Sequence, residues 1–200
     1  MRSAVILAGG EARRAKGREK YFFTCEGKTF IERLVETISG ITEDIVIVAR
    51  NPEQCSRFKD LGGIACTSDI RRGLGPIGGL HAGTLAVQGD EIFVCACDMP
   101  FVNPAVIGYL FGALGSYDAA IPKWDEWMFE PLHAVYRREA LLSYLESHTS
   151  LSLRAMVQSL NTRYIPVDDL RRFDPDLKTF TNINQLDELD RINRCPAPDR

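Results

Sequence analysis

Two adjacent glycines and a group of cations follow a short apolar segment near the start of the chain. Residues 3–8 read SAVILA, and Gly9 and Gly10 come next; the cations after them are Arg13, Arg14, Lys16, Arg18 and Lys20. Glycines let a backbone turn sharply and present bare N–H groups, and successive amides of this kind bind anions. Lysine and arginine close to such a turn pair with phosphate. The pattern predicts a polyphosphate site, and the alternative is a solvated basic turn.

Two common phosphate-binding loops do not match this stretch. A Walker loop requires GxxxxGK[ST], but the run from Gly10 continues to Ala15, Lys16 and Gly17, without the second glycine or the metal-binding hydroxyl. A dinucleotide fingerprint requires GxGxxG, whereas Gly9 and Gly10 are adjacent. The loop is therefore neither that of an ordinary P-loop kinase or GTPase nor that of a dehydrogenase.

A carboxylate closes another apolar segment. Asp98 stands at the end of residues 91–98 in the run CACDMPFV, and Pro100 stops the strand. Carboxylate oxygens suit Mg²⁺ that is held jointly with phosphate oxygens. The alternative is an N-cap for the following helix, but Asn103 lies closer to the expected start of that helix. Asp98 is therefore predicted to bind Mg²⁺.

Two further stretches favour a nucleoside. The run GPIGGLHAG (75–83) is rich in glycine, which costs about 1 kcal/mol more than alanine inside a helix. Gly78 and Gly79 are predicted to let a nucleoside ring lie against the helix start; close packing on a sheet is the alternative and accounts well for Gly83. Asp69 can accept both the N1–H and the amine of a guanine edge, or it can be a solvated loop acid.

The elements that must position these residues alternate along the chain. Short apolar segments separated by amphipathic ones predict an α/β fold, a mostly parallel sheet with helices on both sides. In such a sheet ligands bind beyond the carboxyl ends of the strands, so Gly9, Asp69, Asp98 and either Arg50 or Asn51 should meet at one edge. Strands are expected at 3–8, 44–49, 64–68, 91–98, 117–123, 131–137 and 163–168, and helices at 29–39, 52–61, 76–88, 103–115, 138–147, 151–160 and 184–194.

Length and charge limit the classes of protein that remain. The 200 residues, 45% hydrophobic and 26% charged, predict one soluble domain over 1–194, with a nucleotide-binding half to about residue 115, a substrate-side part from about 116, and a frayed tail at 195–200. The net charge of −3 gives no general affinity for nucleic acid, and no apolar run reaches the roughly 18 residues of a membrane span.

The positions of the cysteines and histidines do not indicate a catalytic role for either residue type. The six cysteines form no CxxC pair and are expected to be buried thiols in a reducing cytoplasm rather than a metal cluster. His81, His133 and His148 have no obvious partner and are expected to be structural or solvated.

The order LAGG-x3-R-x5-K, GP-x-GG-L and CDMP resembles the molybdenum cofactor guanylyltransferase family. The resemblance extends through EPLHAVYRR (130–138), SLRAM (152–156) and FTNINQLDEL (180–189), and so covers nearly the whole chain. It implies a three-layer, Rossmann-like nucleotide-diphospho-sugar-transferase fold. It also implies transfer of GMP from GTP to molybdenum-bound molybdopterin with release of pyrophosphate, and Mg²⁺ as the cofactor.

The resemblance also assigns roles to residues. Other molybdenum cofactor biosynthesis proteins and apo-molybdoenzymes are its implied partners. The implied contacts are Leu7, Ala8 and Gly9 to GTP by backbone, Arg14 and Lys20 to the phosphates, Asp69 to guanosine, either Arg50 or Asn51 to GTP, Asp98 to Mg²⁺ and GTP, and Asn182 and Asn184 on the pterin side. The glycine-rich runs themselves add Gly10, Gly78 and Gly79 to the predicted nucleotide contacts.

The chain departs from the family pattern at three places. Ala15-Lys16 replaces the usual Met-Gly, Glu19 replaces aspartate, and GPIGG replaces GPLAG. Three alternatives stay open: a relative that uses CTP, one that acts on a sugar phosphate, and a non-catalytic carrier of GTP and molybdopterin.

Overall fold

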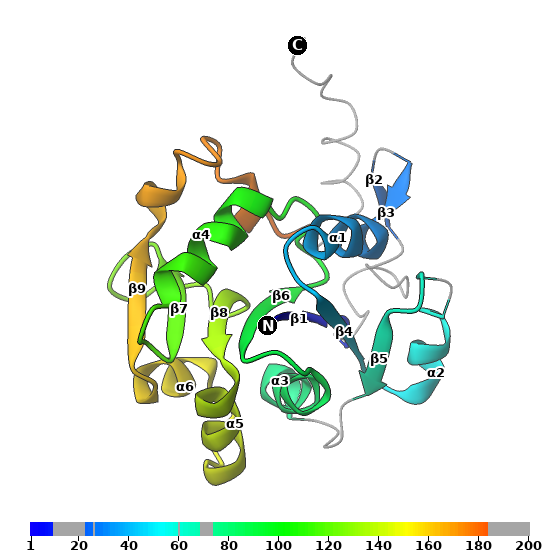
Figure 1. Ribbon diagram of the computed structural model, residues 1–200, viewed down its shortest axis with the longest axis horizontal. Coiled ribbons are helices and arrows are strands. Elements are labelled where there is room, and N and C mark those ends of the chain that lie inside the picture. The colour runs from blue at the N-terminus through cyan, green and yellow to red at the C-terminus, as the bar shows by residue number, and fades with distance from the viewer. Residues whose placement is uncertain (10–22, 26, 60, 69–73, 184–200) are drawn as a thin grey trace.

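A seven-stranded sheet forms the centre of the computed structural model, which describes residues 1–9, 23–25, 27–59, 61–68 and 74–183 (Figure 1). The strands lie in the order β5-β4-β1-β6-β8-β7-β9, and a separate two-stranded hairpin, β2-β3, lies outside the sheet. The strands are β1 (Arg2–Leu7), β2 (Thr24–Cys25), β3 (Lys28–Thr29), β4 (Asp44–Ala49), β5 (Ala65–Ser68), β6 (Glu91–Ala96), β7 (Ala119–Lys123), β8 (His133–Arg137) and β9 (Thr162–Pro166).

The sheet is mostly parallel, with one reversed strand. β1 pairs in parallel with β4 and β6, β4 with β5, and β7 with β9. β8 runs antiparallel to both of its neighbours, β6 and β7. The tight connection 124–132 returns the chain from β7 into β8, which inserts beside β6. The sheet therefore takes strands from both sides of residue 115.

Helices cover both faces of the sheet, which confirms the predicted three-layer α/β fold (Figure 1). α1 (Phe30–Ser39) and α4 (Pro104–Leu114) cover one face, and the short 3₁₀ turns η3 (Val167–Leu170) and η4 (Lys178–Phe180) pack on that side. α3 (Gly75–Ala86), α5 (Arg138–Ser147) and α6 (Leu153–Ser159) cover the other face. α2 (Pro52–Ser56) packs beside β4 and β5.

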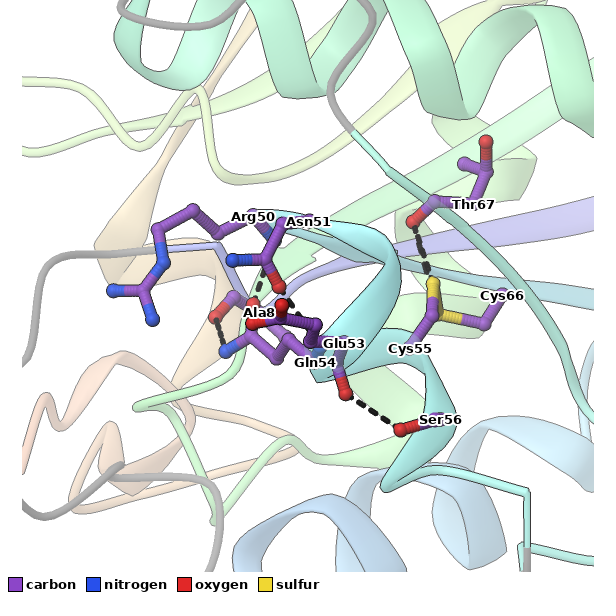
Figure 2. Close-up of a disulfide and its surroundings, with 9 residues drawn as sticks. All are labelled: Ala8, Arg50, Asn51, Glu53, Gln54, Cys55, Ser56, Cys66 and Thr67. Atoms are coloured by element: carbon purple, nitrogen blue, oxygen red, sulfur yellow. Dashed lines mark hydrogen bonds between the residues drawn. A yellow bond between two sulfur atoms is a disulfide. The ribbon is translucent and has the colours of Figure 1, made fainter.

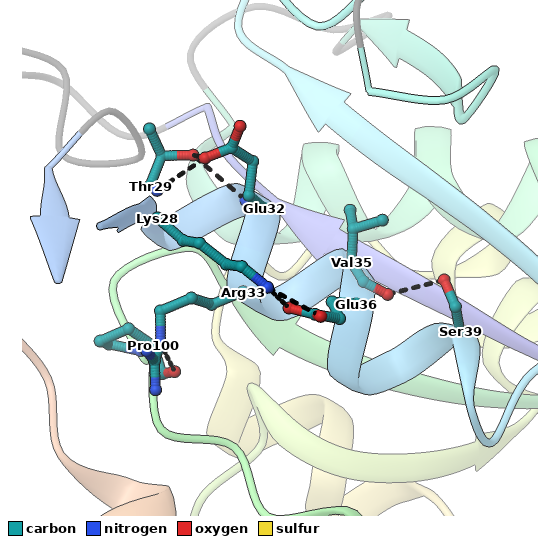
Figure 3. A network of polar contacts seen from close by, with 8 residues as sticks. All are labelled: Lys28, Thr29, Glu32, Arg33, Val35, Glu36, Ser39 and Pro100. Carbon is teal, nitrogen blue, oxygen red and sulfur yellow. Dashed lines mark hydrogen bonds and ion pairs between the residues drawn. The ribbon is translucent and has the colours of Figure 1, made fainter. Parts of the chain in front are cut away.

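Helix α1 lies within the predicted range 29–39, and Thr29 and Glu32 cap its start. Glu32 N donates to Thr29 Oγ1 (3.3 Å), and the Glu32 carboxylate accepts from Thr29 N (2.7 Å), which is a complete capping box (Figure 3). Arg33 Nε donates to the Pro100 carbonyl (3.5 Å) from the same helix. The guanidinium of Arg33 also lies over the Phe101 ring at 5.7 Å. Helix α1 therefore contacts the segment that follows Asp98.

Helix α2 is shorter than predicted. It ends at Ser56, because Arg57 N and Phe58 N bond three residues back, to Gln54 and Cys55, in a tighter turn. Gly62 and Gly63 then have φ of +66° and +83°, which ends helical geometry before β5. The predicted helix at 184–194 lies outside the described residues.

Two of the cysteines do not fit the prediction of buried thiols. Cys55 in α2 and Cys66 in β5 form a disulfide with a Cα–Cα distance of 5.7 Å (Figure 2). The prediction is wrong for this pair because the packing of α2 on β5 brings together two residues that sequence spacing does not connect. It is confirmed for Cys25, Cys95 and Cys97, which are buried thiols, and Cys195 lies outside the described residues.

Within the described part of the chain, none of the helices has the length and apolar character needed to cross a bilayer.

Glycine lets α3 lie directly on β1. A Cβ at Gly83 would come within 2.5 Å of Val5 Cγ1 and 3.0 Å of Val48 Cγ2. A Cβ at Gly79 would lie 3.2 Å from Leu7 Cδ2, the end of a flexible side chain. Close packing therefore explains Gly83 fully and contributes at Gly79.

We expect Gly83→Ala to lower the free energy of unfolding by about 1–3 kcal/mol, because the added methyl overpacks the contact with Val5. Gly79→Ala should cost less, since Leu7 can rotate. Gly112→Ala in α4 is the control: no atom lies within 4 Å of its Cβ, and alanine there should stabilise by up to about 1 kcal/mol. Urea unfolding measures all three, and equal stability of Gly83→Ala and Gly112→Ala would contradict the packing.

Candidate functional site

Backbone hydrogen bonds join the carboxyl ends of β1, β4 and β6 beyond the strands themselves. Ala8 N donates to Val48 O (2.9 Å), and Cys97 N donates to Leu7 O (3.0 Å). The register pairs Leu7 with Ala96, so the residues that follow, Gly9 and Asp98, leave neighbouring strands side by side. Adjacent strands lie about 4.8 Å apart, which places the glycine turn directly beside the carboxylate.

Gly9 lies against the end of β4. A Cβ there would meet Arg50 N at 3.3 Å and Ala49 C at 3.5 Å, both backbone atoms that cannot rotate away. A larger residue would require Gly9 or the end of β4 to shift by a few tenths of an ångström. This close approach therefore favours glycine at the first position of the pair.

Gln54 holds the ends of β1 and β4 together, and sequence reasoning missed it. Its side chain is 3% exposed; its Nε2 donates to Ala8 O (3.3 Å), and its Oε1 accepts from Arg50 N (2.6 Å) (Figure 2). The sequence does show a polar residue in the first turn of a helix directly after a strand. It does not show that Gln54 bonds to Ala8, because the two residues are 46 positions apart.

Asn51 is at the predicted edge, but its side chain caps α2. Its Oδ1 accepts from Gln54 N at 2.8 Å (Figure 2). The cap uses one lone pair and leaves the amide NH₂ for other contacts. A contact from Asn51 to a nucleotide stays a prediction.

Asp98 is half-buried at the end of β6, and the chain returns to it from far away. Its carbonyl accepts from Ile183 N at 2.9 Å, which places the exposed Asn182 next to the Asp98 segment. The alternative of an N-cap at Asp98 is excluded, because Asn103 Oδ1 caps α4 by accepting from Ala105 N at 2.8 Å. Asp98 and Asn182, predicted for different substrates, are thus brought together.

The N-terminus of α3 faces the same edge. The helix begins at Gly75, after the carboxyl end of β5, and Leu74 at its N-cap position has no side-chain oxygen to accept from the first amides. Such amides carry the positive end of the helix dipole and bind anions. Gly78, which is buried, and Gly79 lie in the second turn. This end of α3 is therefore suited to the negative charge of a nucleotide.

Five predicted site residues lie outside the described residues: Gly10, Arg14, Lys20, Asp69 and Asn184. The cationic part of the loop and the guanine-contacting acid therefore stay predictions.

The carboxylate at this edge fits a metal that is shared with substrate. Among the described residues, no three His, Cys, Asp or Glu side chains gather into a metal site. Mg²⁺ in nucleotide sites needs only one or two carboxylates, because phosphates and waters complete its shell. Asp98 can hold the ion in that way.

Burial raises the pKa of the Cys95 thiol, and Cys97 and Asp98 add to the shift, so this thiol stays protonated.

His133 lies beneath the edge as a neutral structural residue. It is fully buried, its Nε2 lies 3.1 Å from Thr179 Oγ1, and its ring packs edge-on against Phe93 and Phe180. Burial lowers its pKa to about 3. The imidazole is thus uncharged near neutral pH, which confirms the predicted structural role.

We expect Gln54→Leu to lower the free energy of unfolding by about 2 kcal/mol or more, because it leaves Ala8 O and Arg50 N without their side-chain partner. Ser56→Ala is the control, since the hydroxyl of this exposed residue donates to Glu53 O within the same helix. Urea denaturation should show Ser56→Ala close to the wild type and Gln54→Leu clearly below both. A Leu variant as stable as the wild type would rule out this role.

The buried imidazole predicts a loss of stability in acid. The unfolded chain binds a proton at His133 below pH 6.5, while the folded chain does so only near pH 3, so the contribution is complete above 6.5 and is lost as pH falls. Between pH 7 and 5 this amounts to about 2 kcal/mol. His133→Gln should show a correspondingly smaller drop over that interval. Identical pH profiles for the two proteins would contradict a neutral His133.

Comparison with known proteins identifies the family. The model of the MobA-like NTP transferase domain matches residues 4–164. A probable molybdenum cofactor guanylyltransferase of Methanosarcina mazei is 37% identical, over 96% of this chain and 89% of that protein. A molybdenum cofactor guanylyltransferase of Desulfosudis oleivorans is 37% identical, over 94% and 93%.

A solved structure agrees with the sequence comparisons. Molybdopterin-guanine dinucleotide biosynthesis protein A from Archaeoglobus fulgidus superimposes with a TM-score of 0.81 at 34% identity, over 96% of each chain. The family match extends over most of the chain and includes Gly9 and Asp98 at adjoining strand ends. The chain therefore belongs to the MobA-like NTP transferase family and is a nucleotidyltransferase.

Proposed function

We propose that this enzyme transfers GMP from GTP to molybdenum-bound molybdopterin, releasing pyrophosphate and forming the molybdopterin guanine dinucleotide cofactor. The observation that carries the proposal is the placement of the Gly9 turn beside Asp98, with Asn182 tied to the same segment through Ile183 N. A phosphate-binding turn, a carboxylate and a second-substrate residue meet at one sheet edge. The relatives named above support guanine and the pterin as the substrates.

The nucleotide occupies the β1, β4 and α3 side of this edge in the proposal. Leu7, Ala8, Gly9 and Gly10 are assigned backbone contacts to GTP. Because Ala8 N already donates to Val48 O, the donors to the triphosphate are the glycine N–H groups and the amides of the α3 N-terminus. The other assigned nucleotide contacts are Arg14 and Lys20 to the phosphates and Asn51, Asp69, Gly78 and Gly79 to the nucleoside, while Asn182 and Asn184 contact the pterin substrate.

The reaction is an in-line displacement at phosphorus. A phosphate oxygen of molybdopterin forms a bond to the α-phosphorus of GTP, and the bond from that phosphorus to the bridging oxygen of the β-phosphate breaks. Two anions must approach each other, so Arg14, Lys20 and the loop amides act by stabilising charge on the leaving pyrophosphate. Mg²⁺, when held by Asp98, supplies further neutralisation of phosphate charge.

No general base is needed for this step. The attacking phosphate oxygen is already deprotonated at neutral pH, and pyrophosphate leaves as an anion. Buried, neutral His133 is consistent with that view, because its role is to pack beneath the edge rather than to exchange protons.

GTP as a substrate places the reaction in the cytoplasm, where other molybdenum cofactor biosynthesis proteins and apo-molybdoenzymes are the proposed partners. Disulfides are rare in that compartment. The redox state of Cys55 and Cys66 in cells therefore bears directly on the proposed location.

We expect Asp98→Ala to abolish pyrophosphate release from GTP while leaving the fold intact, because the ion and the phosphates lose their carboxylate. Asp90→Ala is the control: that carboxylate is exposed and lies just before the amino end of β6, at the opposite edge. The assay contains Mg²⁺ and is run with GTP or CTP, with and without molybdopterin. A preference for CTP, or tight GTP binding without pyrophosphate, would favour the cytidylyl or the carrier alternative.

Lys20→Ala should lower turnover by about 10²–10³-fold, the usual loss for one donor that stabilises developing charge. Lys28→Ala, which removes an exposed cation paired with Glu36, should leave turnover unchanged. Steady-state kinetics with GTP separate kcat from KM for each variant. Wild-type turnover in Lys20→Ala would remove this lysine from the proposed mechanism.

A further inference from the structure

The connection between β7 and β8 carries two tryptophans to the edge where the reaction is placed. β7 ends at Lys123, and His133 at the start of β8 lies opposite Cys95 near the end of β6. The connection 124–132 therefore lies at the carboxyl edge of β6. β8 separates β7 from β6 in the sheet, and β7 pairs with β8 at Ala119 and Ala120, before the connection begins.

Trp124 is held in place while much of its ring stays exposed. Its indole Nε1 donates to Glu130 Oε1 at 2.8 Å, and its ring meets Phe180 edge-to-face at 5.5 Å. Its backbone N donates to Met128 O at 2.8 Å. The side chain nevertheless remains 39% exposed. A fixed aromatic ring with free surface loses little conformational freedom when a flat ligand stacks on it.

A chain of contacts connects this ring to the pterin-side residue. Phe180, the neighbour of Trp124, also packs on His133 at 4.9 Å and lies two residues before Asn182. Ile183 N then bonds to Asp98 O. The nucleotide side of the edge lies at β1, β4 and α3, on the other side of β6 from Trp124. The tryptophan is thus on the side from which the second substrate must approach.

We infer that Trp124 and Glu130 bind the pterin ring system of the second substrate, an inference that rests on the proposed function. A pterin is flat and aromatic, so it can stack on the indole. Its pyrimidine edge presents a ring N–H next to an exocyclic amine, and one carboxylate accepts from both.

Glu130 is suited to this edge. Its Oε1 accepts from the indole, and within the described residues its Oε2 has no partner. Its backbone is fixed, because Glu130 N donates to Pro122 O at 2.9 Å. The carboxylate is therefore positioned by the ring on which the ligand stacks, and Oε2 and the second lone pair of Oε1 remain for the two N–H donors of the ligand.

Trp127 supplies a matched control in the same connection. It is 73% exposed, and its backbone is fixed by Asp125 Oδ1, which accepts from Trp127 N at 2.7 Å, and by a hydrogen bond from Arg154 to its carbonyl. Arg154 belongs to α6, on the opposite face of the sheet from η4 and Phe180. Trp127 thus shares the residue type of Trp124 and is more exposed, but it lacks the link to Asn182.

The test measures binding of 6-hydroxymethylpterin to the full-length chain by isothermal titration calorimetry. Trp124→Ala should weaken binding at least tenfold, the scale of one lost stacking contact, and Trp124→Phe should stay within a few-fold of wild type. Glu130→Gln should weaken binding several-fold, because an amide cannot accept two N–H groups as a carboxylate does. Trp127→Ala should bind as the wild type does, and thermal unfolding shows that each variant is folded.

The inference is overturned if the wild type does not bind the pterin, if Trp124→Ala binds it as tightly, or if Trp127→Ala loses as much. It is also overturned if Trp124→Ala raises KM for GTP and guanosine competes with the pterin, since the ring would then belong to the nucleotide. Failure of the proposed function is a different result: no guanylyl transfer by the wild type, with pterin binding that still depends on Trp124 and Glu130.

Discussion

The lateral hydrogen bonding of β1 to β4 and β6 is the constraint on which the site depends. It continues past the strands through Ala8 N to Val48 O and Cys97 N to Leu7 O. These bonds fix where Gly9 and Asp98 leave the sheet. The two residues are far apart in the sequence, so it is this pairing of strands that brings them close together. A parallel sheet creates such an edge wherever several strands end together, and this chain places a glycine turn on one strand and a carboxylate on the next.

Buried polar groups then hold the less regular segments against this edge. Gln54 joins the ends of β1 and β4 from α2, and its desolvated amide is satisfied by backbone atoms on both sides. Thr179 plays the equivalent part near the end of β6 and the start of β8. Its hydroxyl accepts from Asn103 N at 3.0 Å and lies within hydrogen-bonding distance of His133, so the segment leading to Asn182 is held against α4 and β8. The segments on both sides of the candidate site are therefore positioned by buried hydrogen bonds.

The reversed strand β8 divides the edge into two regions. To one side, parallel strands and the start of α3 present backbone amides and glycines that suit phosphate. To the other, the tight β7–β8 connection presents aromatic rings and Glu130. A parallel crossover at this point would have placed a helix there instead, because parallel neighbours need a long connection. The antiparallel insertion thus brings a short, fixed, aromatic connection to the edge.

The sequence by itself determined the α/β class and most of the strands and helices, and it predicted the sheet edge to which we assign the chemistry. It did so because apolar runs, the Thr29–Glu32 capping box and the Asn103 cap are local signals that act within a few residues. Only the tertiary structure decided the reversal of β8, the Cys55–Cys66 pairing, the role of Gln54 and the return of Ile183 to Asp98. Each of these joins residues that no local pattern connects, so the energy that selects them comes from packing and buried hydrogen bonds across the whole sheet.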